Sequence, residues 1–238
     1  MSTTLPKRSG NASSSLQGGP PEELRSGDRM TREEFHRVYL QTPEHFKAEL
    51  IGGIVYVASP VSRHHGRPHF LLNYAMVAYS ARTPGVEGLN NSTIFLDDDS
   101  EPQPDLSLRI LPEHGGQSST TPDGSYVVGA PELVIEVAYS SRSVDLHAKR
   151  DDYARCGVKE YVVWMAKDDS LAWFDLAQNV ERPLSSDGIV RSIAFPGLWL
   201  DSNAIRDDDL ARLTAALEAG LATPEHAAFV QRLADSKR

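Results

Sequence analysis

The chain has 238 residues and a formal net charge of -9, and its 40% hydrophobic and 24% charged residues are ordinary for a globular protein. No apolar run reaches the roughly 18 residues that cross a bilayer, which excludes a membrane span. The acidic balance argues against a protein that coats nucleic acid through its overall charge, because such binding depends on Lys and Arg contacts to phosphates. A single cysteine, Cys156, excludes an intrachain disulfide and a cysteine-based zinc ribbon, so any metal has to bind oxygen or imidazole.

Three parts are expected along the chain. Residues 1–28 are rich in Ser, Gly and Pro and lack the apolar core of a signal peptide, which predicts a disordered leader and a cytoplasmic protein. Residues 29–200 are expected to form one domain. Residues 201–238 are expected to add a C-terminal extension of two small helices around Ala222-Thr223-Pro224-Glu225.

The first expected elements are a helix, a hairpin and a longer helix. Thr31-Arg32-Glu33-Glu34 has the sequence of a capping box, which predicts a helix to about Leu40. Two apolar runs, residues 46–51 and 54–58, are separated by Gly52-Gly53, the spacing of a tight hairpin. Residues 64–82 repeat apolar side chains at helical spacing, which predicts a packing helix with Pro68 in its first turn.

Strands are expected at residues 92–96 and 103–110. In the second strand apolar residues alternate with Asp105, Ser107 and Arg109, so one face is predicted to join the core and the other to carry Asp105. Residues 111–130 form a Gly, Ser, Thr and Pro-rich connection, and a flap that contacts substrate is one interpretation of it.

A buried strand is expected next, at residues 133–138, because this apolar run shows no alternation. A helix at about residues 144–156 follows and ends at Gly157. Strands at residues 160–165, 171–175 and 190–195 complete a predicted mixed sheet.

Two carboxylates lie in these otherwise apolar strands, Asp105 and Glu136. Burying an ionised carboxylate costs several kcal/mol unless its charge is compensated, so this pair predicts a cation nearby. On a helical wheel Lys149 shares the apolar stripe of the helix that follows Glu136. Asp105, Glu136 and Lys149 are therefore expected to converge, and carboxylate oxygens favour Mg²⁺ or Mn²⁺.

Other interpretations of these residues stay open. Asp105 can be a solvated residue at a strand start, and Glu136 can form a purely structural ion pair with Lys149. Glu49 can form a surface pair with Lys47. His65 and His69 are spaced i, i+4, a pattern of zinc ligands, but no third ligand accompanies them.

The order Pro104-Asp105, Glu136 in a buried strand, then a lysine resembles the PD-(D/E)XK nuclease superfamily. Two residues after Glu136, where that signature has its lysine, the chain has Ala138, so the resemblance implies that the lysine has migrated to Lys149. The chain is also similar to the bacterial Uma-type "putative restriction endonuclease" family. The segments that carry this similarity are residues 30–35, 48–53, 59–64, 103–105, 129–137 and 149–161.

The resemblance implies a restriction-endonuclease-like α/β (α+β) fold, a mixed β-sheet flanked by helices. It implies a DNA endonuclease that depends on Mg²⁺ or Mn²⁺, with Glu49, Asp105 and Glu136 as metal ligands. Lys149 is then expected to assist the attacking water, and His64 to contact phosphate or water. A homodimer is an expectation from the same superfamily.

Two rival functions are weighed against this one. A catalytically silent member would bind DNA or a protein through the same fold, with a closed ion pair between Glu136 and Lys149. A glycosidase with two carboxylates would need an aromatic sugar platform beside them. Trp164, Trp173 and Trp199 lie on later strands, which disfavours this second rival.

Overall fold

The centre of the protein is a six-stranded mixed sheet with the strand order β11-β10-β9-β8-β5-β3. The computed structural model describes residues 23–139 and 141–237. Strands β8 and β9 are parallel, and every other neighbouring pair in this sheet is antiparallel. The predicted mixed sheet flanked by helices is therefore confirmed. The strands of the sheet are β3 (Val86–Asn90), β5 (Leu106–Ile110), β8 (Leu133–Ala138), β9 (Glu160–Met165), β10 (Ser170–Asp175) and β11 (Val180–Arg182).

Strand β8 is buried on both faces, as its unbroken apolar run predicts. Because side chains alternate along a strand, Ile135 and Val137 enter one hydrophobic core, whereas Val134 and Ala138 enter a second core on the other face. Glu136 shares the face of Val134 and Ala138. The sheet thus presents one carboxylate to an otherwise apolar layer.

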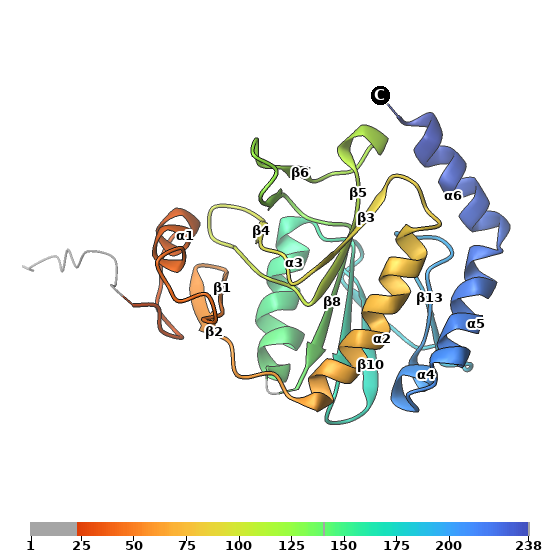
Figure 1. Cartoon of the computed structure of the whole chain (residues 1–238), viewed down its shortest axis with the longest axis horizontal. Helices are drawn as coiled ribbons and strands as arrows, with labels where there is room; N and C mark the ends of the chain where they lie inside the picture. Colours follow the sequence, from red (N-terminus) through yellow and green to blue (C-terminus); the bar gives the residue numbers. More distant parts are fainter. Residues whose placement is uncertain (1–22, 140, 238) are drawn as a thin grey trace, which may run out of the picture.

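Helices cover both faces of the sheet, and Figure 1 shows α2 (Arg63–Ser80) and α3 (Arg150–Cys156) on opposite sides of β8. Leu72, Met76 and Tyr79 of α2 are buried in the first core, and Tyr153 of α3 in the second. A π-helical turn, η2 (Val144–Lys149), leads directly into α3.

Pro68 lies in the second turn of α2, not in the first turn where it was predicted. Its nitrogen carries no hydrogen, so the helix has no donor there for the carbonyl of His64. The helix continues through this position because Pro68 itself is buried against the rest of the protein.

Three C-terminal helices complete the first core: α4 (Ser202–Arg206), α5 (Leu210–Leu221) and α6 (Pro224–Asp235). Figure 1 shows α5 and α6 in blue along the side of the molecule next to α2. Leu213, Leu217, Phe229 and Leu233 are at most 2% exposed and belong to the same cluster as the buried residues of β8. The C-terminal residues are thus part of the packing of the main sheet.

The strand predicted at residues 190–195 does not join the main sheet. Residues 189–191 form β12 (Ile189–Arg191), which pairs only with β13 (Trp199–Asp201) among the described strands. The carboxylate of Glu160 explains the difference, since it accepts hydrogen bonds from the backbone N–H groups of Ile193 and Ala194, both at 3.0 Å. These bonds turn the chain after β12.

A small N-terminal module has its own core. It contains α1 (Arg32–Tyr39), β1 (Ala48–Ile51) and β2 (Ile54–Val57), shown at the left of Figure 1. The capping box at Thr31 and the hairpin through Gly52 and Gly53 are confirmed, and both glycines have the positive φ that such a turn requires. The module joins the main domain where Leu50 and Glu101 exchange two backbone hydrogen bonds.

The predicted leader falls largely outside the described residues, because it covers residues 1–28 and the description begins at residue 23. Gly27 donates a backbone hydrogen bond of 2.8 Å to Val55, and Leu24 is buried in the module's core. The ordered structure therefore starts before Asp28.

The long connection after β5 is a small structured layer. It contains the short helix η1 (Pro112–His114), and its β6 (Ser119–Thr120) and β7 (Val127–Val128) form a three-stranded sheet with β4 (Ile94–Phe95). The side chain of Arg109 holds this layer by donating to the carbonyl of Ser119 at 2.9 Å. No helix in the described part of the chain is long and apolar enough to cross a membrane.

Candidate active site

Lys149 lies at the centre of a buried cluster of acidic side chains. Its Nζ is 2.7 Å from Oε2 of Glu49, 2.9 Å from Oε1 of Glu136 and 3.7 Å from Oδ1 of Asp145. The side chain is only 7% exposed, so these carboxylates replace water around the ammonium group. The helical wheel predicted the inward direction of Lys149, and the structure brings it together with Glu49 and Glu136.

The position of Lys149 follows from the way the chain returns after β8. The π-helical turn η2 ends at Lys149 and places Asp145 one turn earlier, at i, i+4. Tyr153 lies one turn further along, and its hydroxyl donates to Oε1 of Glu136 at 3.0 Å. Single π-helical turns occur often at functional sites, because they move side chains out of the regular helical register.

Asp105 immediately precedes β5 and reaches Glu136 because β5 pairs with β8. Its backbone N–H donates to Oε2 of Glu136 at 3.2 Å. Its Oδ2 accepts from the backbone of Val137 at 2.7 Å and contacts Nε2 of His65 at 3.1 Å. Oδ1 of Asp105 makes no hydrogen bond to the described residues, so one carboxylate oxygen remains available to a ligand.

Carboxyl groups outnumber basic groups in the cluster. Four carboxylates, those of Glu49, Asp105, Glu136 and Asp145, face the single ammonium group of Lys149. Burial raises the pKa of Glu136 well above its ordinary value, and the nearby carboxylates add to this effect although Lys149 opposes it. Burial alone would lower the pKa of Lys149, but the attraction of Glu136 and Glu49 outweighs it and holds the lysine protonated.

Asp105 behaves differently from Glu136. Burial favours its neutral form, but the hydrogen bond from His65 and the nearby charges outweigh burial, and its pKa is lower than usual. Asp105 is therefore ionised near neutral pH, with its unpaired oxygen available. A carboxylate of this kind is suited to bind a cation.

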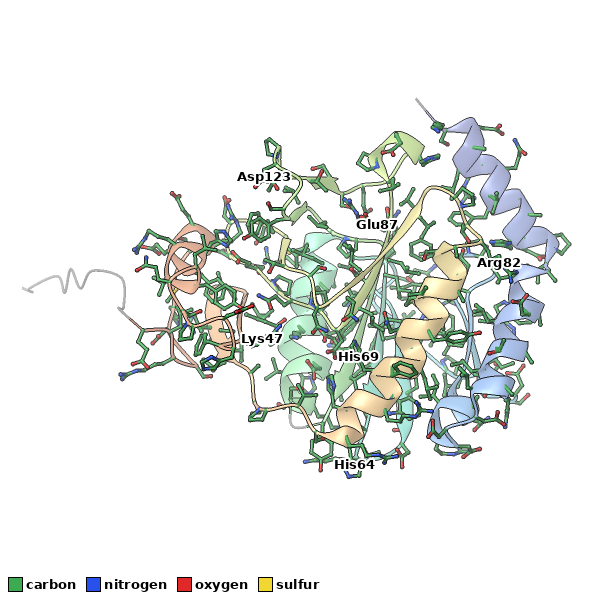
Figure 2. All side chains as sticks on the ribbon, viewed as in Figure 1. Lys47, His64, His69, Arg82, Glu87 and Asp123 are labelled. Carbon is green, nitrogen blue, oxygen red and sulfur yellow. The ribbon has the colours of Figure 1, made fainter. Side chains whose placement is uncertain are left out.

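A cavity of about 790 Å³ opens above the cluster. Asp105, Glu136 and Lys149 line its floor, the β1–β2 hairpin forms one wall and the N-terminal half of α2 forms the other. Figure 2 places Lys47 at the hairpin and His69 on α2, on the two sides of this site. None of residues 111–130 lines the cavity, so the structure does not place the long connection over it.

The structure does not bring His64 to the cluster. The ring of His64 stacks on Tyr139, with centroids 5.6 Å apart, and it lines a separate cavity of about 190 Å³. His65 contacts Asp105 instead, and Nε2 of His69 lies 3.2 Å from the carbonyl oxygen of Asp105. The phase of α2 decides this, since residues 65, 69, 72 and 76 share one face of the helix and residue 64 lies about 100° away.

Asp145, Tyr153 and His65 are members of the cluster that the sequence did not assign. The i, i+4 spacing of Asp145 and Lys149 is a signal for the first of them. Tyr153 shares the apolar stripe of Lys149, and His65 belongs to the i, i+4 pair with His69. Each of these sequence patterns was visible, but each more often marks a residue with a structural role than one in a functional site.

The carboxylates of the cluster supply only part of the ligands that a divalent metal needs. The described residues contain no group of three or more His, Cys, Asp or Glu side chains arranged to hold a metal ion. Glu49 is turned toward Lys149, and its Oε1 accepts from the backbone of Gln103 at 2.7 Å. Asp105 and Glu136 remain, and Mg²⁺ is commonly held by one or two carboxylates with water and substrate phosphate as the other ligands. The residues present therefore fit a site in which Asp105 offers its free oxygen and Glu136 is a second ligand, although the oxygens of Glu136 also accept hydrogen bonds from Lys149, Tyr153 and the backbone of Asp105.

A comparison with protein families decides the relationship. Residues 32–203 match the model of the Uma2 family, which is described as "Putative restriction endonuclease". The chain belongs to the Uma2 family. A search of curated proteins finds no match.

A solved structure supports the fold of this Uma2 protein. It comes from Anabaena variabilis ATCC 29413 and is described as a "putative nuclease belonging to DUF820". The two chains are 14% identical with a TM-score of 0.60, and the match covers 75% of this chain and 98% of the other. At this identity the likeness shows a shared fold alone.

Proposed function

We propose that this Uma2 protein is a DNA endonuclease that depends on Mg²⁺ or Mn²⁺ and hydrolyses phosphodiester bonds. The observation that carries the proposal is the buried pair Asp105 and Glu136 at the floor of the cavity, with Lys149 beside them and an excess of carboxyl groups over basic groups. A divalent cation compensates that excess, and family membership supports a nuclease.

The metal would be held by Asp105 and Glu136. Bound there, it would lower the pKa of a water molecule and neutralise charge on the phosphate oxygens. The other residues position these groups: His65 orients the carboxylate of Asp105, and the hydroxyl of Tyr153 orients that of Glu136.

Lys149 acts in this proposal as a hydrogen-bond donor. Its neighbours hold it protonated, so it offers N–H bonds to the attacking water or to a phosphate oxygen and does not accept the proton from water. Glu49 has a supporting role, because its Oε2 holds the ammonium group in place. The proposal thus assigns Glu49 to Lys149 and leaves it out of the metal ligands.

The test uses two circular substrates, supercoiled plasmid and circular single-stranded DNA, incubated with the full-length protein and Mn²⁺ or with EDTA. Wild-type protein is expected to nick or linearise at least one of them only with Mn²⁺. Asp105→Asn, Glu136→Gln and Lys149→Ala are each expected to lower the rate about 100-fold or more. Asp123→Asn, an exposed carboxylate on a distant turn in Figure 2, is the matched control and should cleave normally. Cleavage that survives all three site substitutions would overturn the proposal.

A second candidate is a catalytically silent binding protein. The close contacts of Lys149 with both Glu49 and Glu136 favour it, because a closed ion-pair network can be purely structural. This candidate predicts DNA binding without cleavage and no heat of Mn²⁺ binding in titration calorimetry. The glycosidase is disfavoured, since none of the three tryptophans lines the cavity.

A further inference from the structure

The acidic cluster lies at the floor of a cavity that is small for a nucleic acid duplex. The side chains of Asp105 and Glu136 are only 13% and 5% exposed. The volume of about 790 Å³ falls in the range of roughly 300–1,000 Å³ typical of pockets that enclose one drug-sized ligand. A nucleotide has that size, whereas a duplex of several base pairs contains many nucleotides and does not fit inside. A phosphate in a continuous duplex reaches such a floor only if its strand leaves the duplex, as in base-flipping enzymes.

Tyr56 supplies an aromatic surface next to the cluster. It pairs with Glu49 across the hairpin, and residues directly opposite in an antiparallel pair project to the same face. Its half-buried side chain therefore lines the cavity beside the carboxylate that holds Lys149. Tyr39 and Tyr139 stack on other rings, but Tyr56 makes no such contact with the described residues. Aromatic rings placed in this way are the platforms on which the bases of single strands stack.

One basic side chain lies at the rim of the cavity and another on its wall. Lys47 is exposed, precedes Glu49 by two residues and lines the same cavity. It makes no ion pair with the described residues. His69 lies on the opposite wall, on α2 (Figure 2). This rim suits the phosphates of a few nucleotides, whereas the net charge of -9 disfavours a grip on many phosphates of a duplex.

From the depth of the cavity, the free ring of Tyr56 and the short basic rim, we infer that the cavity binds a single-stranded segment of DNA in preference to continuous duplex. One base stacks on Tyr56, and the adjoining phosphate is directed toward Asp105 and Glu136. This inference rests on the proposed nuclease function, because it names the substrate class of the same site.

The test measures binding separately from cleavage. Fluorescence anisotropy is recorded with a labelled single strand of about 20 nucleotides, longer than the roughly 4–16 nucleotides that single-strand binding folds cover, and with the blunt duplex of the same sequence. Full-length Asp105→Asn protein with Mn²⁺ keeps the DNA intact, and wild-type protein in EDTA repeats the comparison without metal. The single strand is expected to bind at least tenfold more tightly than the duplex.

Substitutions at Tyr56 test the stacking surface, in the Asp105→Asn background and in the wild-type protein. Tyr56→Ala is expected to weaken single-strand binding about tenfold and to leave duplex binding nearly unchanged. Tyr56→Phe keeps the ring and is the matched control, expected to bind like its parent. Circular dichroism spectra of the variants check that the hairpin and the rest of the fold are retained.

Three results would overturn the inference: equal binding of duplex and single strand, unchanged binding by Tyr56→Ala, or tighter binding of RNA of the same sequence. If duplex oligonucleotides are cleaved and bind as tightly as the single strand, this inference is wrong but the proposed nuclease function stands. If the protein cleaves no DNA, the proposed nuclease function is wrong. The binding measurements would still show whether the cavity prefers single-stranded DNA to duplex.

Discussion

Replacing Lys149 by methionine tests the ion-pair network on which the site depends. Methionine keeps much of the side-chain volume but removes the charge that faces Glu49, Glu136 and Asp145 at 2.7, 2.9 and 3.7 Å. Removing one partner of a buried ion pair costs about 3–5 kcal/mol, because the remaining charge is left in a medium that solvates it poorly. Lys149→Met is therefore expected to lower the free energy of unfolding by about 3–5 kcal/mol, a large part of the roughly 5–15 kcal/mol of a typical domain.

The assay is urea unfolding at neutral pH, followed by circular dichroism and tryptophan fluorescence. Lys159→Met is the matched control, since Lys159 is 45% exposed and its Nζ is 3.7 Å from Glu132. The buried carboxylate of Glu132 also accepts hydrogen bonds from the backbone of Ile110 and Gln117, so losing the lysine is expected to cost less than about 1 kcal/mol. In the double variant, Glu136→Gln is expected to restore about 2 kcal/mol to Lys149→Met, because it removes the unpaired charge. The reasoning would be refuted if Lys149→Met lost no more stability than Lys159→Met. It would also be refuted if the stability losses of Lys149→Met and Glu136→Gln were simply additive in the double variant.

Three further predictions follow from other contacts. His65→Ala is expected to slow Mn²⁺-dependent cleavage about tenfold or more, and His65→Gln, which can keep a donor to Asp105, to slow it less; equal losses would contradict the orienting role. Burial raises the pKa of Glu101 from 4.5 to about 7, so the folded protein retains a proton there that the unfolded chain releases. The stability that this group contributes is fully present below pH 4.5 and is lost as the pH rises through 7, by up to about 3 kcal/mol. Urea unfolding at pH 5 and at pH 8 measures this loss, and Glu101→Gln should reduce the difference in the free energy of unfolding between the two pH values. A chain that ends at Asp209 loses the four apolar side chains that α5 and α6 contribute to the first core, worth roughly 6–12 kcal/mol, and should show no cooperative unfolding transition by circular dichroism.

Features that depend on neighbours in the sequence were predicted well. The capping box at Thr31 and the glycine turn at residues 52–53 are local, and so is the apolar run of β8. The inward direction of Lys149 also follows from its own helix, because side-chain direction repeats with the helical period. These signals were sufficient to predict that Glu136 and Lys149 both enter the core.

Two strands that depend on distant residues were not predicted correctly. Strand β3 was not predicted, because Glu87, Gly88 and Asn90 interrupt its apolar pattern. It is a strand because it pairs with β5. Residues 190–195 have an apolar pattern, but the carboxylate of Glu160 turns them away from the main sheet. In both cases a contact with a remote strand outweighs the local pattern.

The sequence by itself determined that Glu136 and Lys149 are buried, since an acid in an unbroken apolar run and a lysine on an apolar stripe have no route to water. Only the tertiary structure decided what each of them meets. Pairing of β5 with β8 brings Asp105 to Glu136, the hairpin delivers Glu49 to Lys149, and the phase of α2 selects His65 over His64. Hydrogen bonds and ion pairs act over a few ångströms, so these partners depend on how distant segments pack, which local periodicity does not specify.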